Sequence, residues 1–422
     1  MLGFCKPISS KKRFSPRRDL LPGYTFCLFE KAAHIPAEFW NPLAASKGLF
    51  LHRDYLHIIE SSQFAKLMYR YALVYENQKP CGIVYFQVSD FNAGLFGGLV
   101  ENKSISKHKQ LLQKYVLAHH QETMMRLITC GNNLISGDYG FYFDKKISEA
   151  QSHTLVLALC DIMGKEDKIK NTISATLIKD FEQALKPAKL FKDEKFSTFS
   201  VEPNMVLDIP AGLDSVEAYI QLFSKKYRNR AKSIFKKLAD VEVKALSTAE
   251  VKQLNTTLYG LYEAIFNEAK FKLIKLPPDY FYQCRKNFED RFFITCFYLK
   301  GEPVAFYSYI LNGKVMEAHY IGLNYDLNID YCLYQNILYD LISVAIKNKV
   351  EKLNLGRTAA EIKTTVGALP QSLVCYIKPL NTVSKLIQKP LMNLLEPTAY
   401  TPRNPFKEVA ETESIPVFDP AN

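Results

Sequence analysis

The stretch Leu353–Pro370, LNLGRTAAEIKTTVGALP, combines the signals of a buried strand and of a polar turn. Leu353 and Leu355 alternate with other residues, as in a short strand, and Gly356 then allows the backbone to turn sharply. The polar side chains that follow within seven positions are Arg357, Thr358, Glu361 and Lys363. Because α/β proteins place ligands just beyond the carboxyl ends of inner strands, this turn is the first candidate for a functional site.

Length and composition are those of an ordinary globular protein with an excess of basic residues. At 422 residues the chain is expected to form two or three domains, and 48% hydrophobic and 23% charged residues are typical of globular sequences. The formal net charge of +11 favours anionic partners, such as the phosphates of CoA or nucleotides, RNA, or an acidic membrane surface. The same charge is compatible with a basic protein that has no such partner.

Cysteine usage and hydropathy indicate the compartment in which the chain works. The nine cysteines include no Cys-x-x-Cys pair, which predicts buried thiols in a reducing cytoplasm and neither a disulfide framework nor a metal site. The basic N-terminal residues precede no apolar signal segment, and no apolar run approaches the roughly 20 residues of a membrane span. We therefore expect a cytoplasmic protein, with attachment to the inner face of the membrane left open.

The first half of the chain alternates predicted helices and strands. Residues 1–23 are basic and contain prolines, which predicts a flexible arm before a folded part that begins near Tyr24. The elements expected after it are a helix at 51–62, a hairpin at 69–90, a helix at 103–122, a strand at 125–131, a helix at 148–164 and a strand at 173–180. This alternation indicates an α/β fold.

The second half repeats this order. Residues 291–323 predict a three-strand meander, and a long helix Asp330–Lys349 follows with Asp330 as its N-cap. Strands at 352–356 and 372–379 complete the unit. Between the halves, the hairpin at 69–88 corresponds to 292–311, LITCGN to LNLGR, and residues 177–179 to 376–378. We interpret the shared order as an internal duplication with a period of roughly 200 residues, far longer than a solenoid repeat.

A basic helix opens the second unit. Its apolar stripe, within residues 222–238, includes Tyr227 and Phe235. The basic side chains on the rest of the helix are Lys225, Lys226, Arg228, Arg230, Lys232, Lys236 and Lys237. Such a face is either simply solvated or recognises phosphates on a donor or a lipid-linked acceptor. The expected division of the chain is an arm at 1–23, units at 24–203 and 204–380, and a proline-spaced tail at 381–422.

Three motifs together resemble the FemAB-like, or BioF2-like acetyltransferase, group of the GNAT acyltransferase superfamily. They are SKKYRNRAKSIFKK, similar to the Lys/Arg-rich helix of that family, LNLGRTAAEIKTTVGA, similar to its glycine, Glu-x-Lys and glycine pattern, and the following strand that ends in VCYIKP. The resemblance covers about residues 24–380 and implies tandem GNAT units, each a mixed sheet flanked by helices. No Lys or Glu follows CGNN (130–133) at the spacing of the second unit, so the first unit is expected to be degenerate.

One motif of the resembled superfamily is missing. Many GNAT proteins that use acetyl-CoA carry a Gln/Arg-x-x-Gly-x-Gly/Ala loop whose backbone amides bind the pyrophosphate at a helix N-terminus. The corresponding loop here, GLNYDLNIDY (322–331), has no such pattern. The donor is therefore expected to be an acyl-CoA bound differently, an acyl carrier protein or an aminoacyl-tRNA, and no resident cofactor is expected.

Acyl transfer to an amine requires a positioned donor, a stabilised oxyanion and an acceptor for the amine proton. We expect Lys363 to place positive charge at the oxyanion, and Glu361 or His319 to accept the proton. The residues expected to bind substrate are Arg357 and Thr358 in the turn and Lys226, Tyr227, Arg228 and Arg230 on the basic helix. Each has a structural alternative: a core histidine, a local ion pair, a loop anchor or a solvated helix face.

The sequence therefore predicts an N-acyltransferase that moves an acyl group from acyl-CoA or acyl carrier protein to an amine. The amine would belong to an amino sugar, an amino acid or a cell-envelope precursor. One alternative is an aminoacyl-tRNA-dependent peptidyltransferase of the FemABX type, in which the basic helix and the +11 charge serve the tRNA. The other is a non-catalytic GNAT-fold binding protein. Peripheral contact with a membrane could accompany any of the three.

Overall fold

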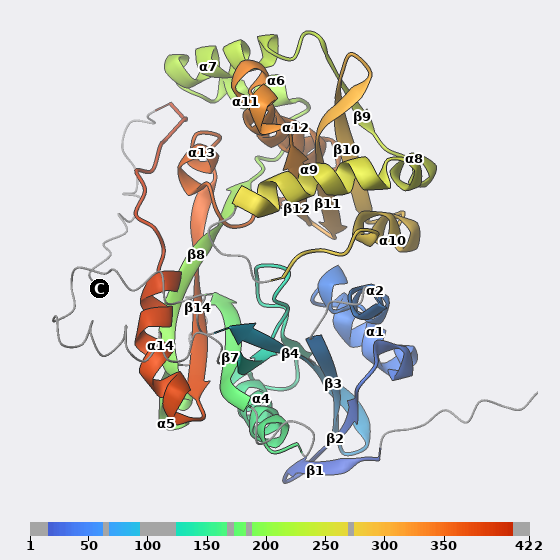
Figure 1. Cartoon of the computed structure of the whole chain (residues 1–422), viewed down its shortest axis with the longest axis vertical. Helices are drawn as coiled ribbons and strands as arrows, with labels where there is room; N and C mark the ends of the chain where they lie inside the picture. Colours follow the sequence, from blue (N-terminus) through green and yellow to red (C-terminus); the bar gives the residue numbers. More distant parts are fainter. Residues whose placement is uncertain are drawn as a thin grey trace, which may run out of the picture.

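One mixed β-sheet runs through the molecule, and helices cover it (Figure 1). The computed structural model describes residues 16–61, 67–92, 124–166, 173–182, 188–268 and 274–407. The predicted helix at 103–122 lies outside the described residues. Within them the sheet has 14 strands, and no helix is long and apolar enough to cross a membrane.

The elements of the first half follow the order that the sequence predicts. They are β1 (Arg18–Leu21), β2 (Tyr24–Phe29), η1 (Ala32–His34), α1 (Ala37–Ala45), η2 (Leu49–Leu51), α2 (Arg53–Ser61), β3 (Leu67–Glu76), β4 (Lys79–Asn92), β5 (Met124–Cys130), β6 (Phe141–Phe143), α4 (Glu149–Gly164), β7 (Ile173–Glu182), α5 (Ala188–Asp193) and β8 (Ser197–Asp208). The predicted helices at 51–62 and 148–164 are α2 and α4, and Ser148 caps α4 by accepting a hydrogen bond from the amide of Gln151.

The second half contains more helices than the sequence predicts. Its elements are α6 (Val216–Gln221), α7 (Lys225–Lys236), β9 (Val241–Ala245), α8 (Thr248–Gln253), α9 (Asn255–Glu268), α10 (Tyr280–Asn287), β10 (Phe292–Leu299), β11 (Glu302–Asn312), β12 (Val315–Leu323), α11 (Tyr325–Tyr331), α12 (Leu333–Lys347), β13 (Lys352–Asn354), α13 (Ala360–Thr364), β14 (Leu369–Pro379) and α14 (Thr382–Leu395). The predicted meander is β10 to β12, and the predicted basic helix is α7.

Two parallel strand pairs mark equivalent places in the two units. The strand order is β1-β2-β3-β4-β5-β7-β14-β8-β13-β12-β11-β10-β9, with β6 paired to β4 beside this path. β5 and β7 are parallel, as are β12 and β13, while the other pairs are antiparallel. α4 connects the first pair and α12 the second, because parallel neighbours need a crossover. The predicted fold class, tandem units of mixed sheet flanked by helices, is confirmed.

The two units exchange strands at the centre of the sheet. β14, the last strand of the second unit, pairs with β7 of the first. β8, the last strand of the first unit, pairs with β13 of the second, and β8 and β14 also pair with each other. Each unit therefore completes the sheet of the other through main-chain hydrogen bonds. The predicted boundary at residue 204 lies within β8.

This topology changes part of the predicted correspondence between the halves. The hairpin β3–β4 does match β10–β11, because in each unit these are the first two strands outside the parallel pair. However, β5, which contains LITC, matches β12, and β7 matches β13. The predicted match of LITCGN with LNLGR is wrong by one strand. The reason is that 31 residues, 93–123, separate β4 from β5, so the meander of the first unit looks shorter in sequence than that of the second.

The N-terminal end of the fold differs from the prediction of a flexible arm at 1–23, and the proline-spaced tail contains a helix that the sequence did not predict. Arg18–Leu21 form β1, which pairs with β2, and the guanidinium of Arg18 lies over the ring of Phe26, so the fold begins before Tyr24. In the tail, residues 382–395 form α14, which packs on β8 and β14 (Figure 1). Pairing and apolar contacts therefore hold both segments.

Asp330 is not the N-cap of the long helix, contrary to the prediction. It lies in α11, and α12 begins at Leu333 after Cys332 adopts a left-handed conformation with φ 49°. The side-chain amide of Asn336 donates hydrogen bonds to the backbone carbonyls of Tyr331 and Cys332, and these bonds stabilise the break between the two helices. The polar run 324–331 therefore forms a short helix of its own, which a single periodic pattern does not reveal.

The hydrophobic core joins the two units as well as filling each of them. One cluster packs α1 and α2 of the first unit against α8, α9 and α10 of the second. Its largest buried side chains include Trp40, Tyr55, Tyr71, Tyr280 and Phe281. Separate clusters lie under α4 in the first unit and under α6, α7 and α12 in the second. The described cysteines are free thiols, and all except the half-buried Cys332 are buried, as predicted.

The chain after α14 forms a strap that passes α13 and reaches the start of α7 (Figure 1). The backbone amide of Arg403 donates to Thr364 Oγ1 at 3.0 Å, and the amide of Ser224 donates to the carbonyl of Pro405 at 2.8 Å. The ring of Phe406 occupies the space beside Gly367, where a Cβ would lie 2.6 Å from it. The strap thus connects α13 to the start of α7 and fixes their relative positions.

We predict that Gly367→Ala destabilises the protein more than Gly301→Ala. Both glycines have positive φ, 95° and 84°, which costs any other L-residue about 1–2 kcal/mol. At Gly367 the new methyl group also overlaps Phe406 and the hydroxyl of Tyr219, whereas nothing lies within 4 Å at Gly301. Crowding should add about 1–3 kcal/mol. Urea unfolding of the two variants measures the difference, and equal losses would contradict this packing of the strap.

Candidate active site

The polar turn lies between β13 and α13, at the carboxyl end of a central strand. Gly356, Thr358 and Ala359 have φ values of 69°, 65° and 49°. Positive φ is rare for a β-branched residue such as Thr358 and is typical of sites where function requires a particular backbone shape. The side chain of Asn354 supports the turn by accepting a hydrogen bond from the amide of Gly356 at 2.9 Å.

Lys363 points back into this turn. Its Nζ donates to the carbonyls of Gly356, at 3.1 Å, and Arg357, at 2.6 Å, and the residue is only 4% exposed. Burial lowers the pKa of Lys363 to about 7, because an ammonium is poorly solvated there. Two of its N–H groups are therefore used to hold the backbone, and only the ammonium form has a third.

We predict that Lys363→Met changes both the stability of the protein and its pH dependence. The two carbonyls lose their donor, which should cost about 1–3 kcal/mol for each group left unsatisfied. Because folding lowers the pKa of Lys363, the unfolded chain binds more protons above pH 7, and the wild type gains stability from about pH 7 towards the usual lysine range. Denaturant titrations from pH 6 to 9 should show a smaller gain for the variant; parallel curves would contradict the buried amine.

A buried cluster of charges, Lys179, Asp180 and Arg357, joins the turn to the first unit. Arg357 forms an ion pair with Asp180, and Lys179 Nζ lies 2.8 Å from Asp180 Oδ2. Burial raises the pKa of Asp180, but Arg357 and Lys179 outweigh it and bring the pKa to about 2. The carboxylate also accepts a hydrogen bond from the amide of Gly137 at 3.0 Å. The predicted substrate-binding residue Arg357 therefore has a structural partner inside the protein.

Lys179 has the same kind of contact on the first unit that Lys363 has on the second. Its Nζ donates to the carbonyls of Asn132, at 2.8 Å, and Ile135, at 2.6 Å. A Cβ at Gly131 would meet the Lys179 side chain at 2.5 Å, so only glycine fits where this lysine crosses the turn. The CGNN segment, predicted to be structural, is thus bound by a buried lysine.

β12 and β13 separate immediately beside the turn. They pair only over Val315–Glu317 and Lys352–Asn354, while β12 continues to Leu323. The pairing of β12 with β11 is also irregular. Tyr307 of β11 pairs with Ile321 and Tyr309 pairs with Ala318, so β12 has a bulge at residues 319–320. Bulges redirect side chains and are common next to active sites. Beyond Glu317 and Asn354 the two strands no longer pair, which leaves an opening in the hydrogen-bond ladder of the sheet.

The loop at 131–140 of the first unit reaches this opening. Tyr139 Oη donates to Glu317 Oε1 at 3.0 Å, and Tyr320 Oη donates to the carbonyl of Leu134. Ser136 Oγ donates to Asn204 Oδ1 at 2.7 Å. The first unit, predicted to be degenerate, therefore supplies one wall of the candidate site.

Glu317 is the ionisable residue that the sequence reasoning missed. It is the last residue of β12 that pairs with β13, it is 9% exposed, and it accepts a hydrogen bond from Tyr139. Burial raises the pKa of Glu317 to about 6, against the lowering effect of Tyr139 and Asn354. A carboxylate with a pKa in this range suits general-base catalysis near neutral pH. The sequence signal for Glu317 is an acidic residue within the apolar strand VMEAHYIG, two positions before His319.

His319 lies on the same strand, among aromatic side chains. Its Nε2 is 2.7 Å from Tyr280 Oη, which is in turn 2.9 Å from Tyr55 Oη. Burial lowers the pKa of His319 to about 3, so the imidazole is neutral at physiological pH. The ring of Phe50 contacts both His319 and Tyr139, which places His319 close to Glu317 and its donor.

The other predicted site residues lie further from the opening. Glu361 is exposed and binds Arg403 of the strap, with Oε1 2.6 Å from the guanidinium. On α7, the amine of Lys226 lies 5.8 Å from the ring of Tyr227. Within the described chain, no hydrogen bond or ion pair connects the side chains of Lys226, Tyr227, Arg228 and Arg230 to the turn. The structure thus separates the predicted site residues into the turn and the basic helix.

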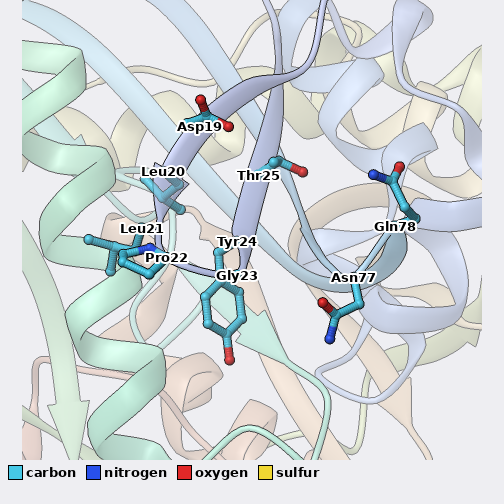
Figure 2. Close-up of a pocket in the computed structure, with 9 residues that line it drawn as sticks. All are labelled: Asp19, Leu20, Leu21, Pro22, Gly23, Tyr24, Thr25, Asn77 and Gln78. Atoms are coloured by element: carbon cyan, nitrogen blue, oxygen red, sulfur yellow. The ribbon is translucent and has the colours of Figure 1, made fainter.

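The first turn of α12 differs from a phosphate-binding helix start. The preceding residues form α11, and Cys332 in its left-handed conformation is the N-cap. This arrangement replaces the glycine-rich loop that the sequence lacks. A separate hollow of about 510 Å³ lies at the far edge of the first unit, between β1, β2 and the β3–β4 turn (Figure 2). None of the predicted site residues lines it.

Comparisons with known proteins identify the fold. No family model matches the sequence, and no curated protein matches it. The structure is similar to the crystal structure of FemX, with a TM-score of 0.51 and 11% sequence identity over 84% of this chain and 98% of that chain. It is also similar to the C-terminal domain (DUF2156) of a putative lysylphosphatidylglycerol synthetase from Agrobacterium fabrum, with a TM-score of 0.46 and 8% identity over 84% and 94% of the two chains.

A third similar structure is a tandem GNAT protein from the clavulanic acid biosynthesis pathway, with a TM-score of 0.45 and 10% identity over 85% of this chain and 99% of that chain. At these identities a likeness establishes the fold and not the substrate. The match to FemX shows that this chain has a FemX-like fold over 84% of its length, built on the two parallel strand pairs and the exchanged central strands.

Proposed function

We propose that the protein is an N-acyltransferase that moves an acyl group from an activated donor to an amine. The observation that carries this proposal is the position of Glu317, a buried carboxylate at the point where β12 and β13 separate, beside a strained polar turn. The FemAB-like fold supports the reaction class. Acyl transfer fits such a site because it needs a positioned donor and one proton acceptor, and no redox or metal chemistry.

The proposed reaction has one addition step and one elimination step. The amine nitrogen attacks the acyl carbonyl carbon, and Glu317 accepts the proton that the nitrogen loses. The tetrahedral intermediate then collapses, the bond from the carbonyl carbon to the thioester sulfur or ester oxygen breaks, and the leaving group takes up the proton held by Glu317. Tyr139 holds the Glu317 carboxyl in place through the 3.0 Å hydrogen bond. Tyr139 is in this sense a positioning residue supplied by the first unit.

We propose that Lys363 places positive charge at the oxyanion, as expected from the sequence, and its hydrogen bonds support this role. In the ammonium form two N–H groups hold the carbonyls of Gly356 and Arg357, and the third is available to the developing oxyanion. Glu361 and His319 stay predictions as proton acceptors. Glu361 is engaged by Arg403, and His319 would accept a proton only weakly because burial lowers its pKa to about 3. We therefore favour Glu317 in this role.

The donor is proposed to be an acyl thioester on CoA or on an acyl carrier protein. Because α11 takes the place of the glycine-rich loop, a CoA pyrophosphate would need other contacts than the usual helix N-terminus. The amine acceptor is proposed to belong to an amino sugar, an amino acid or a cell-envelope precursor. Both assignments extend the family resemblance and are open to direct test.

Native mass spectrometry of the protein purified from its own host tests the donor. A co-purifying CoA thioester or acyl carrier protein would support the proposal and name the donor class. A co-purifying tRNA would instead favour an aminoacyl-tRNA-dependent peptidyltransferase. If acyl-CoA and acyl carrier donors raise the melting temperature but no transfer to any amine follows, the protein binds without catalysis and the proposal is wrong.

A further inference from the structure

α7 presents a dense row of cations that the fold does not neutralise. Of its basic residues, Lys225, Lys226, Arg230, Lys232 and Lys236 are exposed, as is the adjacent Lys237. Within the described chain none of them forms an ion pair with a carboxylate, although Lys179, Arg70 and Arg126 elsewhere do. The apolar stripe of α7 is buried through Ala231 and Ile234, so the cations cannot rotate inward. This face therefore keeps a strong positive potential towards solvent.

Exposed apolar side chains lie next to this row. Lys237 Nζ donates to the carbonyl of Ile329 at 3.1 Å, which places α11 beside the end of α7. Ile329 is 79% exposed and Tyr325, on the same short helix, is 44% exposed. At the other end of α7, Leu222 is also exposed. Figure 1 shows α6, α7 and α11 grouped at one end of the molecule, away from the first unit.

We propose that this end of the molecule docks on the surface of an anionic lipid bilayer. The basic side chains would lie over the lipid phosphates, and Ile329 and Tyr325 would enter the headgroup region. A cationic helix face beside a few apolar anchors is the pattern of a protein that lies on a membrane and does not span it. The inference concerns where the protein acts and holds whichever acyl group is transferred.

The same observations favour a bilayer over RNA. Proteins that bind single-stranded nucleic acid without sequence preference present aromatic rings on which bases stack. The two rings on α7, Tyr227 and Phe235, are only partly exposed, and Phe235 packs edge-on against Tyr339, 5.0 Å between centroids. The exposed ring of Tyr325 lies on α11, outside the row of cations. The most exposed large apolar side chain, Ile329, is aliphatic and has no use against a base. Asp326 and Asp330 on α11 would repel both partners, so they do not discriminate between them.

Flotation of the full chain with vesicles tests the proposal. Vesicles of phosphatidylcholine alone are compared with vesicles that also contain phosphatidylglycerol, from low to high NaCl. Wild-type protein should bind the anionic vesicles and lose binding as salt screens the charges. Lys232→Glu/Lys236→Glu should lower the partition coefficient at least about 25-fold, since each cation near the surface contributes about fivefold. Ile329→Ser should lower it about threefold to tenfold and leave the salt dependence unchanged.

The matched control is Lys145→Glu/Lys146→Glu, an exposed pair before α4 that changes the net charge by the same amount. If the control binds as poorly as Lys232→Glu/Lys236→Glu, only net charge matters and the proposed face is wrong. Equal binding to both kinds of vesicle would also overturn it. A parallel gel-shift assay with tRNA distinguishes the sources of phosphate: salt-sensitive tRNA binding without vesicle binding would assign the face to nucleic acid. Thermal melts of all variants confirm that each is folded.

Discussion

Glu317→Gln should abolish most of the acyl transfer while the protein stays folded. Glutamine cannot accept the amine proton, and loss of a general base typically costs about 10²–10⁴-fold in rate. The carbonyl oxygen of glutamine can still accept the hydrogen bond from Tyr139, so the local structure should persist. The measurement is the single-turnover rate of transfer with the donor identified by mass spectrometry.

The pH dependence gives an independent signature of the same residue. Because burial raises the pKa of Glu317 to about 6, the wild-type rate should fall as pH drops below that value. The Glu317 carboxyl contributes most to the stability of the folded protein at pH values below its ordinary pKa. This contribution is lost as pH rises through 6. The loss is about 2 kcal/mol, from a rise of the pKa from 4.5 to about 6. Glu317→Gln lacks this loss and should be at least as stable as wild type at pH 8.

Glu361→Gln is the matched control for the proton acceptor. Glu361 is exposed and bound to Arg403, so neutralising it should change the rate little if Glu317 is the base. The opposite result, a slow Glu361→Gln and a normal Glu317→Gln, would move the general base to α13. A normal rate in both variants would leave His319 or a water molecule as the acceptor and remove the observation on which the proposed mechanism rests.

Arg357→Met should be among the most destabilising single substitutions in the protein. It removes one cation from the buried cluster and leaves Asp180, which has no exposed surface, with Lys179 and the amide of Gly137 as partners. Breaking a buried ion pair in this way typically costs about 3–5 kcal/mol. Because Lys179 partly compensates, we expect about 3 kcal/mol in urea unfolding. Arg403→Met, which removes the exposed pair with Glu361, should show little change.

The acid limb of stability should shift in the same variant. The pKa of Asp180 lies below its ordinary value, so the carboxylate stabilises the fold above pH 4, and this is lost as pH falls towards 2. Without Arg357 the pKa of Asp180 rises, and acid unfolding should begin at higher pH. Combining Arg357→Met with Asp180→Asn should cost less than the sum of the two changes. Additive losses would mean that the two side chains do not interact in solution.

The polar turn shows how far a local pattern reaches. Its glycine, its charged residues and its place after a strand could be predicted from the sequence, because strand alternation and turn residues are local signals. The direction of each side chain could not. Lys363 and Glu361 are two residues apart, yet Lys363 is buried against the turn and Glu361 is exposed to the strap. A short helix sends neighbouring residues to different sides. Lys363 contacts carbonyls six and seven residues away, whereas the partner of Glu361, Arg403, comes from a segment 42 residues away.

The sequence by itself determined the class of fold, the duplication, the basic helix and the position of the candidate turn. All four depend on periodicity and on residue types close together in the chain. Only the tertiary structure decided that β8 and β14 cross between the units, that Asp180 meets Arg357 and that Tyr139 meets Glu317. The two side-chain contacts join residues that are 177 and 178 positions apart in the chain. Such partners are chosen by how whole sheets pack, and no local pattern encodes that choice.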